Sequence, residues 1–245
     1  MVCSFHIDNK MTFINFQSIS LNFQKVLVTA LMVFVLWLIF IAASWGIADF
    51  VAREVRYETA QWQKKSEPLK TGTWKSAQAS INLTRVLEAG HPDFLEDMAG
   101  AHFFLYRYGI ITPAEKVMAL QQSLDYYLKV AKRQPSSALT YANIALVKYY
   151  LREYDAQFLK ALENATSLGP WEPFVQHVVA EVGLAAWFFF PKQGRENGRK
   201  IVLANVERGM LRQAKLMTTL IKKYHREKVM CVYGMQKAVF SVFCY

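Results

Sequence analysis

Cysteine is scarce in this sequence, and the motifs that mark metal centres and nucleotide-binding loops are missing. Its 245 residues include three cysteines, with no CxxC pair and no Cys/His spacing typical of zinc sites. The sequence contains no HExxH, no GxSxG, no Walker A loop and no Rossmann glycine fingerprint. We therefore expect no metal, no cofactor and no nucleotide chemistry.

Three cysteines are also too few for a disulfide scaffold. Cys231 and Cys244 could pair if this part of the chain faces an oxidising compartment. From the sequence alone we favour buried or free thiols over that pairing.

One group of titratable residues could support acid/base chemistry. His91 and Asp93, with Glu96 and Asp97, fall together at the expected start of a helix. Acidic residues in a first helical turn ordinarily compensate the helix dipole. We therefore expect a protein that is not an enzyme, and keep a glycan-processing enzyme that uses His91, Asp93 or Glu96 as an alternative.

The sequence does have one long apolar run near its N-terminus. Residues 26–48 include no ionisable side chain, and about 20 apolar residues suffice for a helix to cross a hydrocarbon core. Lys25 closes one end, Asp49 closes the other, and Trp45 is placed for interfacial anchoring. The run is too long and begins too late for a cleaved signal peptide. We predict one uncleaved transmembrane helix over 26–48, behind an N-terminal tail of residues 1–25.

The charges that flank this run bear on its orientation in the membrane, but their number alone does not decide it. Lys10 and Lys25 precede it, and four basic residues follow it closely, which favours a cytoplasmic C-terminal part. Acidic residues are interleaved with those four, however, and long domains cross membranes largely regardless of charge. We expect the tail in the cytoplasm of a bacterium and the domain on the periplasmic side of its inner membrane.

Helical periodicity continues beyond the apolar run and leads into one further domain. Residues 49–73 are predicted to form a helical stalk and a linker that contains Pro68 and Gly72. The remainder, residues 74–245, is long enough for one domain with its own core. Apolar residues recur there at helical spacing between Pro and Gly breaks. We predict an all-α fold with helices over 74–89, 93–107, 113–134, 137–152, 154–168, 172–189, 195–223 and 226–242.

Prolines divide part of this domain at a regular interval. Pro135 and Pro170 lie 35 residues apart, and Ala145 and Ala180 follow them at matching positions where two helices could approach closely. The segment from Tyr141 to Pro170 resembles a degenerate tetratricopeptide repeat. We expect a tetratricopeptide-like solenoid or an irregular bundle, because a lone helix pair cannot bury its apolar face.

Large aromatic and apolar residues of the domain are expected in its core. Residues 178–190 are strongly apolar, but they include Glu181 and are too few for a clean span, so we predict a buried helix there. The same core, rather than a ligand groove, is expected to hold Trp74, Phe94, Phe103, Phe104, Tyr126, Tyr149, Phe174 and Trp187.

Positive charge is concentrated late in the chain. The formal net charge is +10, and residues 192–237 alone contain twelve Lys or Arg against three Glu. One predicted buried face of the helix there consists of Leu203, Val206, Met210, Ala214, Met217 and Ile221. Outside that face lie Arg208, Arg212, Lys215 and Lys222. These four basic residues could contact anionic lipid headgroups, an acidic glycan or an acidic partner protein, or form a solvated face; nucleic acid is not expected.

Several features of the layout occur together. They are the string Ala48-Asp49-Phe50-Val51-Ala52-Arg53 after the span, Trp74 at the domain start, the proline-separated helix pairs, and the basic Pro191–Cys231 segment. This layout resembles the VpsP-type polysaccharide biosynthesis proteins of Gram-negative bacteria over most of residues 26–231, and leaves out residues 232–245.

The resemblance implies a single-pass accessory protein without chemistry of its own. Such a protein scaffolds polymerase, chain-length or export components of exopolysaccharide assembly in the membrane, and its helix-pair surfaces bind those partners. An assembly factor for another envelope or respiratory complex is the alternative.

Overall fold

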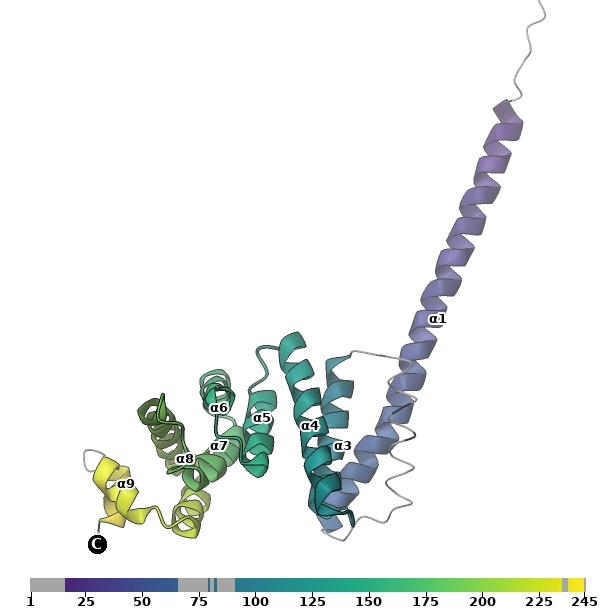
Figure 1. The fold of residues 1–245 in the computed structure, drawn as a ribbon. Coiled ribbons are helices and arrows are strands. Elements are labelled where there is room, and N and C mark those ends of the chain that lie inside the picture. The colour runs from purple at the N-terminus through teal and green to yellow at the C-terminus, as the bar shows by residue number, and fades with distance from the viewer. Residues whose placement is uncertain (1–15, 66–78, 80–81, 83–90, 235–237, 245) are drawn as a thin grey trace, which may run out of the picture. The chain divides into compact units, whose positions relative to one another are not determined.

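The structure, a computed structural model, describes residues 16–65, 79, 82, 91–234 and 238–244. The chain divides into two compact units, residues 1–47 and residues 48–245. Throughout the described residues the regular structure is helical, so the predicted all-α fold is confirmed (Figure 1). Its elements are α1 (Phe16–Lys65), α3 (Pro92–Tyr108), α4 (Pro113–Arg133), α5 (Ala138–Leu151), α6 (Ala156–Leu168), α7 (Pro173–Ala185), α8 (Arg195–Lys223), α9 (Glu227–Gly234) and the 3₁₀ helix η1 (Ala238–Phe243).

Helix α1 contains the predicted apolar span. Its residues Phe23–Ile47 are long and apolar enough to cross a membrane. Large side chains along this stretch, including Phe34 and Trp37, are exposed. A lone helix suits a bilayer because all its backbone polar groups are satisfied internally. Helix α1 begins at Phe16, so part of the predicted tail is helical, and it continues to Lys65 through the predicted stalk.

The second unit is a helical bundle of successive pairs. Helix α3 packs on α4, α5 on α6, and α7 on α8, while α5 also packs on α4 and α7. Most of the predicted helix 74–89, with Trp74, lies outside the described residues. The helices predicted over 93–107, 113–134, 137–152 and 154–168 are present with small differences at their ends.

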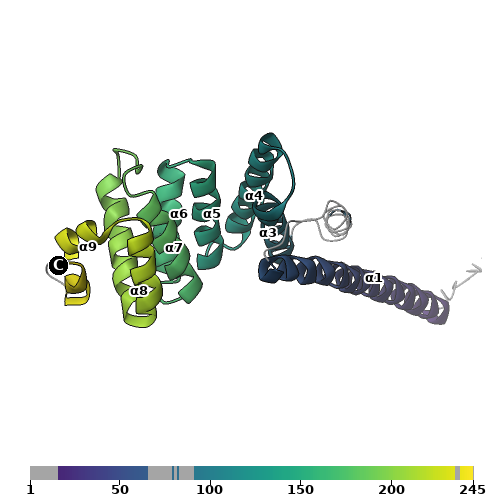
Figure 2. The same ribbon diagram turned by 90° about the horizontal axis from the view of Figure 1, so that it is seen from below.

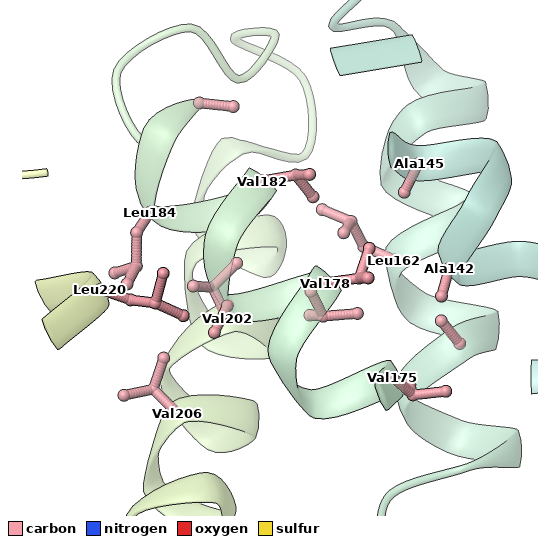
Figure 3. Packing of buried hydrophobic residues seen from close by; sticks show 14 of the residues in the cluster. Ala142, Ala145, Leu162, Val175, Val178, Val182, Leu184, Val202, Val206 and Leu220 are labelled. Atoms are coloured by element: carbon pink, nitrogen blue, oxygen red, sulfur yellow. The ribbon is translucent and has the colours of Figure 1, made fainter. Parts of the chain in front are cut away.

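The core of the bundle is centred on α5, α7 and α8. Ala145 and Ala180 are both fully buried, as the predicted close approach of helices requires. Gly183 on α7 is a third small contact residue, because a Cβ there would clash with the Val202 side chain of α8. Figure 3 shows apolar side chains of this core, among them Ala142, Ala145, Leu162, Val175, Val178, Val182, Leu184, Val202, Val206 and Leu220.

Local side-chain bonds explain where two of the helices begin. Thr112 caps α4, because its hydroxyl accepts from Glu115 N at 3.3 Å and its own N–H donates to Glu115 Oε2 at 2.7 Å. The string Thr112-Pro113-Ala114-Glu115 indicates a helix start in the sequence, and the structure has both bonds of the capping box there. Asp155 caps α6 by accepting from Phe158 N at 2.9 Å.

A buried cation fixes the turn between α5 and α6. The side chain of Lys148 is only 2% exposed, and its ammonium lies 2.8 Å from Glu153 Oε2 and 3.0 Å from Asp155 Oδ2. It also donates to Gln157 Oε1 at 3.1 Å. Burial of a charge is tolerated when it is paired and hydrogen-bonded, as it is here.

Helix α7 is buried, as predicted for residues 178–190, but it ends at Ala185 rather than at residue 189. Trp187 and Phe190 are buried beyond that end, and Phe188 and Phe189 are exposed. The residue before Pro191 is disfavoured in the helical region, so the chain must leave the helix before that proline.

Helix α8 folds back on itself at Gln213, whose φ of −133° and ψ of 43° are not helical. Residues eight apart on a straight helix are about 12 Å apart. Thr218 Oγ1 nevertheless lies 3.9 Å from Met210 Sδ. The segments before and after Gln213 therefore lie side by side (Figure 2).

The single continuous helix predicted over 195–223 is therefore wrong at its middle. Ala214 is exposed and Leu203 only half-buried, whereas Val206, Met210, Met217 and Ile221 are buried as predicted. The regular spacing of the buried residues along the helix is therefore interrupted at the reversal. There the Gln213 side-chain amide donates to Pro173 O at 3.3 Å and to Gln176 Oε1 at 3.0 Å.

The C-terminal region corrects two further expectations. The single helix predicted over 226–242 is wrong, because α9 ends at Gly234 and η1 begins at Ala238. The expectation of free thiols is also wrong, because Cys231 and Cys244 form a disulfide with their Cα atoms 5.0 Å apart. Their spacing lies in the usual range for disulfides.

Candidate functional site

The four predicted basic residues are divided between the two segments of α8. Arg208 is half-buried before Gln213, and its Nε has no hydrogen-bond partner in the part of the chain that the structure describes. Arg212 and Lys215 are exposed on either side of the reversal and line one shallow depression with Gln213. Lys222 is exposed near the end of the second segment. The structure therefore brings Arg212 and Lys215 together at one depression.

Arg212 packs against an aromatic residue that sequence reasoning missed. Its guanidinium carbon lies 5.3 Å from the centre of the Trp171 ring, and its Nη1 donates to Trp171 O at 3.4 Å. Trp171 is 47% exposed and lies in the turn between α6 and α7. The sequence did contain a signal for an exposed Trp171. This residue directly follows Gly169-Pro170, which indicate a turn, and a turn at the surface seldom buries its side chains.

The apolar neighbours of this pair are also exposed. Phe174 is 46% exposed, so its predicted place in the core is wrong. Phe94 and Trp187 are buried as predicted, whereas Phe103, Phe104, Tyr126 and Tyr149 are half-buried. We use the name Trp171 surface for Leu168, Trp171, Phe174, Leu211, Arg212 and Lys215.

A second surface is a continuous series of aromatic rings. Its successive ring centres are 6.1, 5.2, 5.2, 6.5 and 5.4 Å apart. The series begins on α3, crosses the end of α5 and ends in the turn after α7. We call it the aromatic ladder; it consists in order of Phe103, Tyr106, Tyr150, Tyr149, Tyr154 and Phe189. Phe103 and the four tyrosines are half-buried and pack against the core of the bundle, whereas Phe189 is exposed.

Charged groups border this ladder. Arg107 Nη1 donates to the Tyr150 hydroxyl. Glu181 on α7 accepts from Lys223 Nζ at 2.8 Å and from the Tyr224 hydroxyl at 3.2 Å. Burial alone would raise the pKa of Glu181, but the hydrogen bond and charge of Lys223 hold that pKa below its ordinary value. The carboxylate therefore stays ionised and joins α7 to the end of α8.

The acidic cluster at the start of α3 joins two helices. Asp97 Oδ2 accepts from Arg56 Nε of α1 at 2.7 Å. Burial raises the pKa of Asp97, and Arg56 opposes that rise. Burial, with Asp97 and Asp93, also raises the pKa of Glu96. His91 Nδ1 lies 3.9 Å from Asp93 Oδ2. The cluster therefore includes an ion pair that joins α1 to α3. An acid/base role for His91, Asp93 or Glu96 stays a prediction.

Among the residues that the structure describes, no group of three or more His, Cys, Asp or Glu side chains is arranged to hold a metal ion. The chain matches no family model, no curated protein and no solved structure with which it was compared. The tetratricopeptide-like and VpsP-type resemblances therefore stay predictions from the sequence.

Proposed function

We propose that this chain is a non-enzymatic accessory protein of a bacterial inner membrane. Helix α1 spans the bilayer, and the bundle binds partner proteins through surfaces that its helix pairs present. The observation that carries this proposal is an exposed apolar helix of membrane-spanning length in the same chain as a helical bundle. A single span cannot enclose a polar path, so a binding role suits it better than transport.

The disulfide supports a periplasmic position for the bundle. Disulfides persist in oxidising compartments, including the bacterial periplasm, and are rare in the cytosol. The Cys231–Cys244 bond lies at the far end of the chain from the apolar part of α1. The N-terminal tail then lies in the cytoplasm.

The aromatic ladder is the surface best suited to a partner protein. Tyr and Arg are enriched at the centres of protein interfaces, where aromatic rings supply large contact areas. The ladder combines four tyrosines with Arg107 at its border and an exposed end at Phe189. From the resemblance to VpsP-type proteins, we propose that the partners are membrane-embedded components of exopolysaccharide assembly.

Capture of partners tests this proposal. The full chain, crosslinked in cells and purified from detergent-solubilised membranes, should recover polysaccharide-assembly proteins. Phe189→Ala should reduce that recovery about tenfold, because truncation of an interface aromatic commonly costs over 1 kcal/mol. Val117→Ala, which removes an exposed apolar side chain of α4, is the matched control and should leave recovery unchanged.

Two outcomes would redirect the proposal. Recovery of another envelope or respiratory complex in place of polysaccharide-assembly proteins would identify an assembly factor for that complex. Recovery of no membrane protein by the wild type would contradict the scaffold role itself.

A further inference from the structure

The Trp171 surface combines exposed apolar and basic side chains at one place on the bundle. Leu211 is 68% exposed, and Leu168, Trp171 and Phe174 are each more than 40% exposed. Leu168 and Phe174 are close to Trp171 in sequence, and the contact between Trp171 and Arg212 brings Leu211 to the same place. Scattered exposed apolar residues are ordinary, but a group of this kind marks a binding surface.

Contacts hold this surface in one geometry. Arg212 bonds and stacks on Trp171, and Gln213 donates to Pro173 O at 3.3 Å. The α8 reversal is thereby fixed against the turn between α6 and α7. The rings and the cations are positioned before any ligand arrives, which lowers the entropy cost of binding.

The positive charge of the surface is available to an anionic ligand. Within the described part of the chain, neither Arg212 nor Lys215 has a carboxylate partner at ion-pair distance. Lys223, by contrast, is paired with Glu181 at 2.8 Å. Charge complementarity therefore favours an anionic partner at Arg212 and Lys215.

We infer that the Trp171 surface docks on the anionic phospholipid surface of the bilayer, as a second membrane contact besides α1. Trp, Phe and Leu beside Arg and Lys are the composition of segments that lie in a membrane interface. Basic residues near an anionic membrane are attracted to its negative surface potential. This inference rests on the proposed spanning role of α1.

Tethering favours the bilayer over a soluble partner protein. The bundle follows in the same chain as the apolar stretch, which ends at Ile47. A bilayer crossed by α1 is then present at high effective concentration, and a weak contact suffices for docking.

Tryptophan quenching in nanodiscs tests the inference with the full chain. The probe is a brominated lipid added to phosphatidylcholine bilayers with or without phosphatidylglycerol. The difference in emission between wild type and Trp171→Phe isolates the signal of Trp171. We expect that signal to fall roughly twofold in bilayers with phosphatidylglycerol, and to stay unchanged in phosphatidylcholine alone.

Charge variants provide the matched control. Arg212→Gln with Lys215→Gln should abolish the quenching of Trp171, whereas Lys132→Gln with Arg133→Gln removes the same charge from exposed positions on α4 and should preserve it. Far-UV circular dichroism and thermal melting check that all variants fold. Trp171 emission that is unquenched in both lipids, or equally quenched in both, would overturn the inference.

The same measurement separates this inference from the function on which it rests. The emission that remains in Trp171→Phe includes Trp37 and Trp45 of the apolar stretch. Quenching of that emission without quenching of Trp171 rejects docking alone. If that emission is also unquenched, the spanning role of α1 fails as well.

Discussion

Two apolar helices of this chain have opposite surroundings. In α1 the side chains of residues 23–47 are mostly exposed, with Leu36 65% exposed. In α7 the core-facing side chains are covered, and Val179 is fully buried. Local apolarity therefore does not decide where a helix resides.

Helices α1 and α7 differ in the length of their apolar stretch and in whether other helices cover it. The apolar stretch of α1 has 25 residues, whereas α7 has 13 and extends only about 20 Å. A hydrocarbon core is about 30 Å thick, so α7 is too short to cross it. Helices α5 and α8 instead cover α7, and Glu181 bonds to Lys223 and Tyr224.

A carboxylate placed in each helix should produce the largest difference. Val179→Asp puts an unpaired charge in the core and should destabilise the bundle by more than about 4 kcal/mol. Leu36→Asp should leave the bundle folded but disfavour membrane insertion by about 2.5–3.5 kcal/mol. Thermal melting and membrane fractionation measure the two effects. A bundle that tolerates Val179→Asp and unfolds with Leu36→Asp would reverse the comparison.

Reduction of the disulfide should affect the bundle alone. The bond joins residues 13 apart, and closing a loop of this size contributes about 3 kcal/mol. Cys231→Ser should therefore lower the melting temperature of the bundle while membrane retention stays constant. Cys3→Ser is the control and should change neither. Equal melting of the Cys231→Ser variant and the wild type under oxidising conditions would argue against the bond.

A methyl group added at one glycine of each helix should destabilise the bundle only where another side chain covers that glycine. Gly183→Ala directs a Cβ into the branched side chain of Val202, which cannot swing away, and should cost about 2 kcal/mol. Gly46→Ala in α1 has no neighbour within 4 Å and should not change bundle stability. Chemical denaturation measures both. A neutral Gly183→Ala would mean that α7 and α8 approach less closely than described.

The smallest expected effect is a dependence on pH that the bundle has and the apolar stretch lacks. Burial lowers the pKa of His102 from 6.5 to about 4. Between these values the unfolded chain binds a proton that the folded chain does not, so stability falls as pH drops. The loss should be about 1–2 kcal/mol between pH 7 and pH 5.

His102→Gln isolates that contribution in denaturant titrations at the two pH values. Glu96 and Asp97 have raised pKa values and so stabilise the fold as pH falls, but they do so in both proteins. The wild type should lose more stability than His102→Gln, while membrane retention is the same. Parallel pH profiles would show that His102 is not the group responsible.

Patterns along one helix could be predicted well from the sequence. The length of the apolar run predicted the exposed part of α1, and the Thr-Pro-Ala-Glu string predicted the start of α4 at Pro113. Glu181 and the short apolar run predicted that α7 is buried. Each of these features depends on neighbouring residues and on the geometry of a single helix.

Features that depend on contacts across the fold could not be predicted. The reversal at Gln213 interrupts an otherwise regular apolar spacing, and its stabilising partners Pro173 and Gln176 belong to another helix. The pairing of Cys231 with Cys244 depends on the end of α9 at Gly234. For the candidate sites, charge spacing identified Arg212 and Lys215, but their association with Trp171 required the tertiary structure.

The most direct test of the proposed anchoring is the topology of the chain in a bacterial membrane. A reporter enzyme that is active only outside the cytoplasm is fused after Tyr245, and a second fusion at the same position carries a reporter active only in the cytoplasm. We predict activity of the first, with both fusions retained in the membrane fraction. Activity of the second, or release of either fusion from the membrane by alkaline carbonate, would contradict a bundle anchored on the periplasmic side by α1.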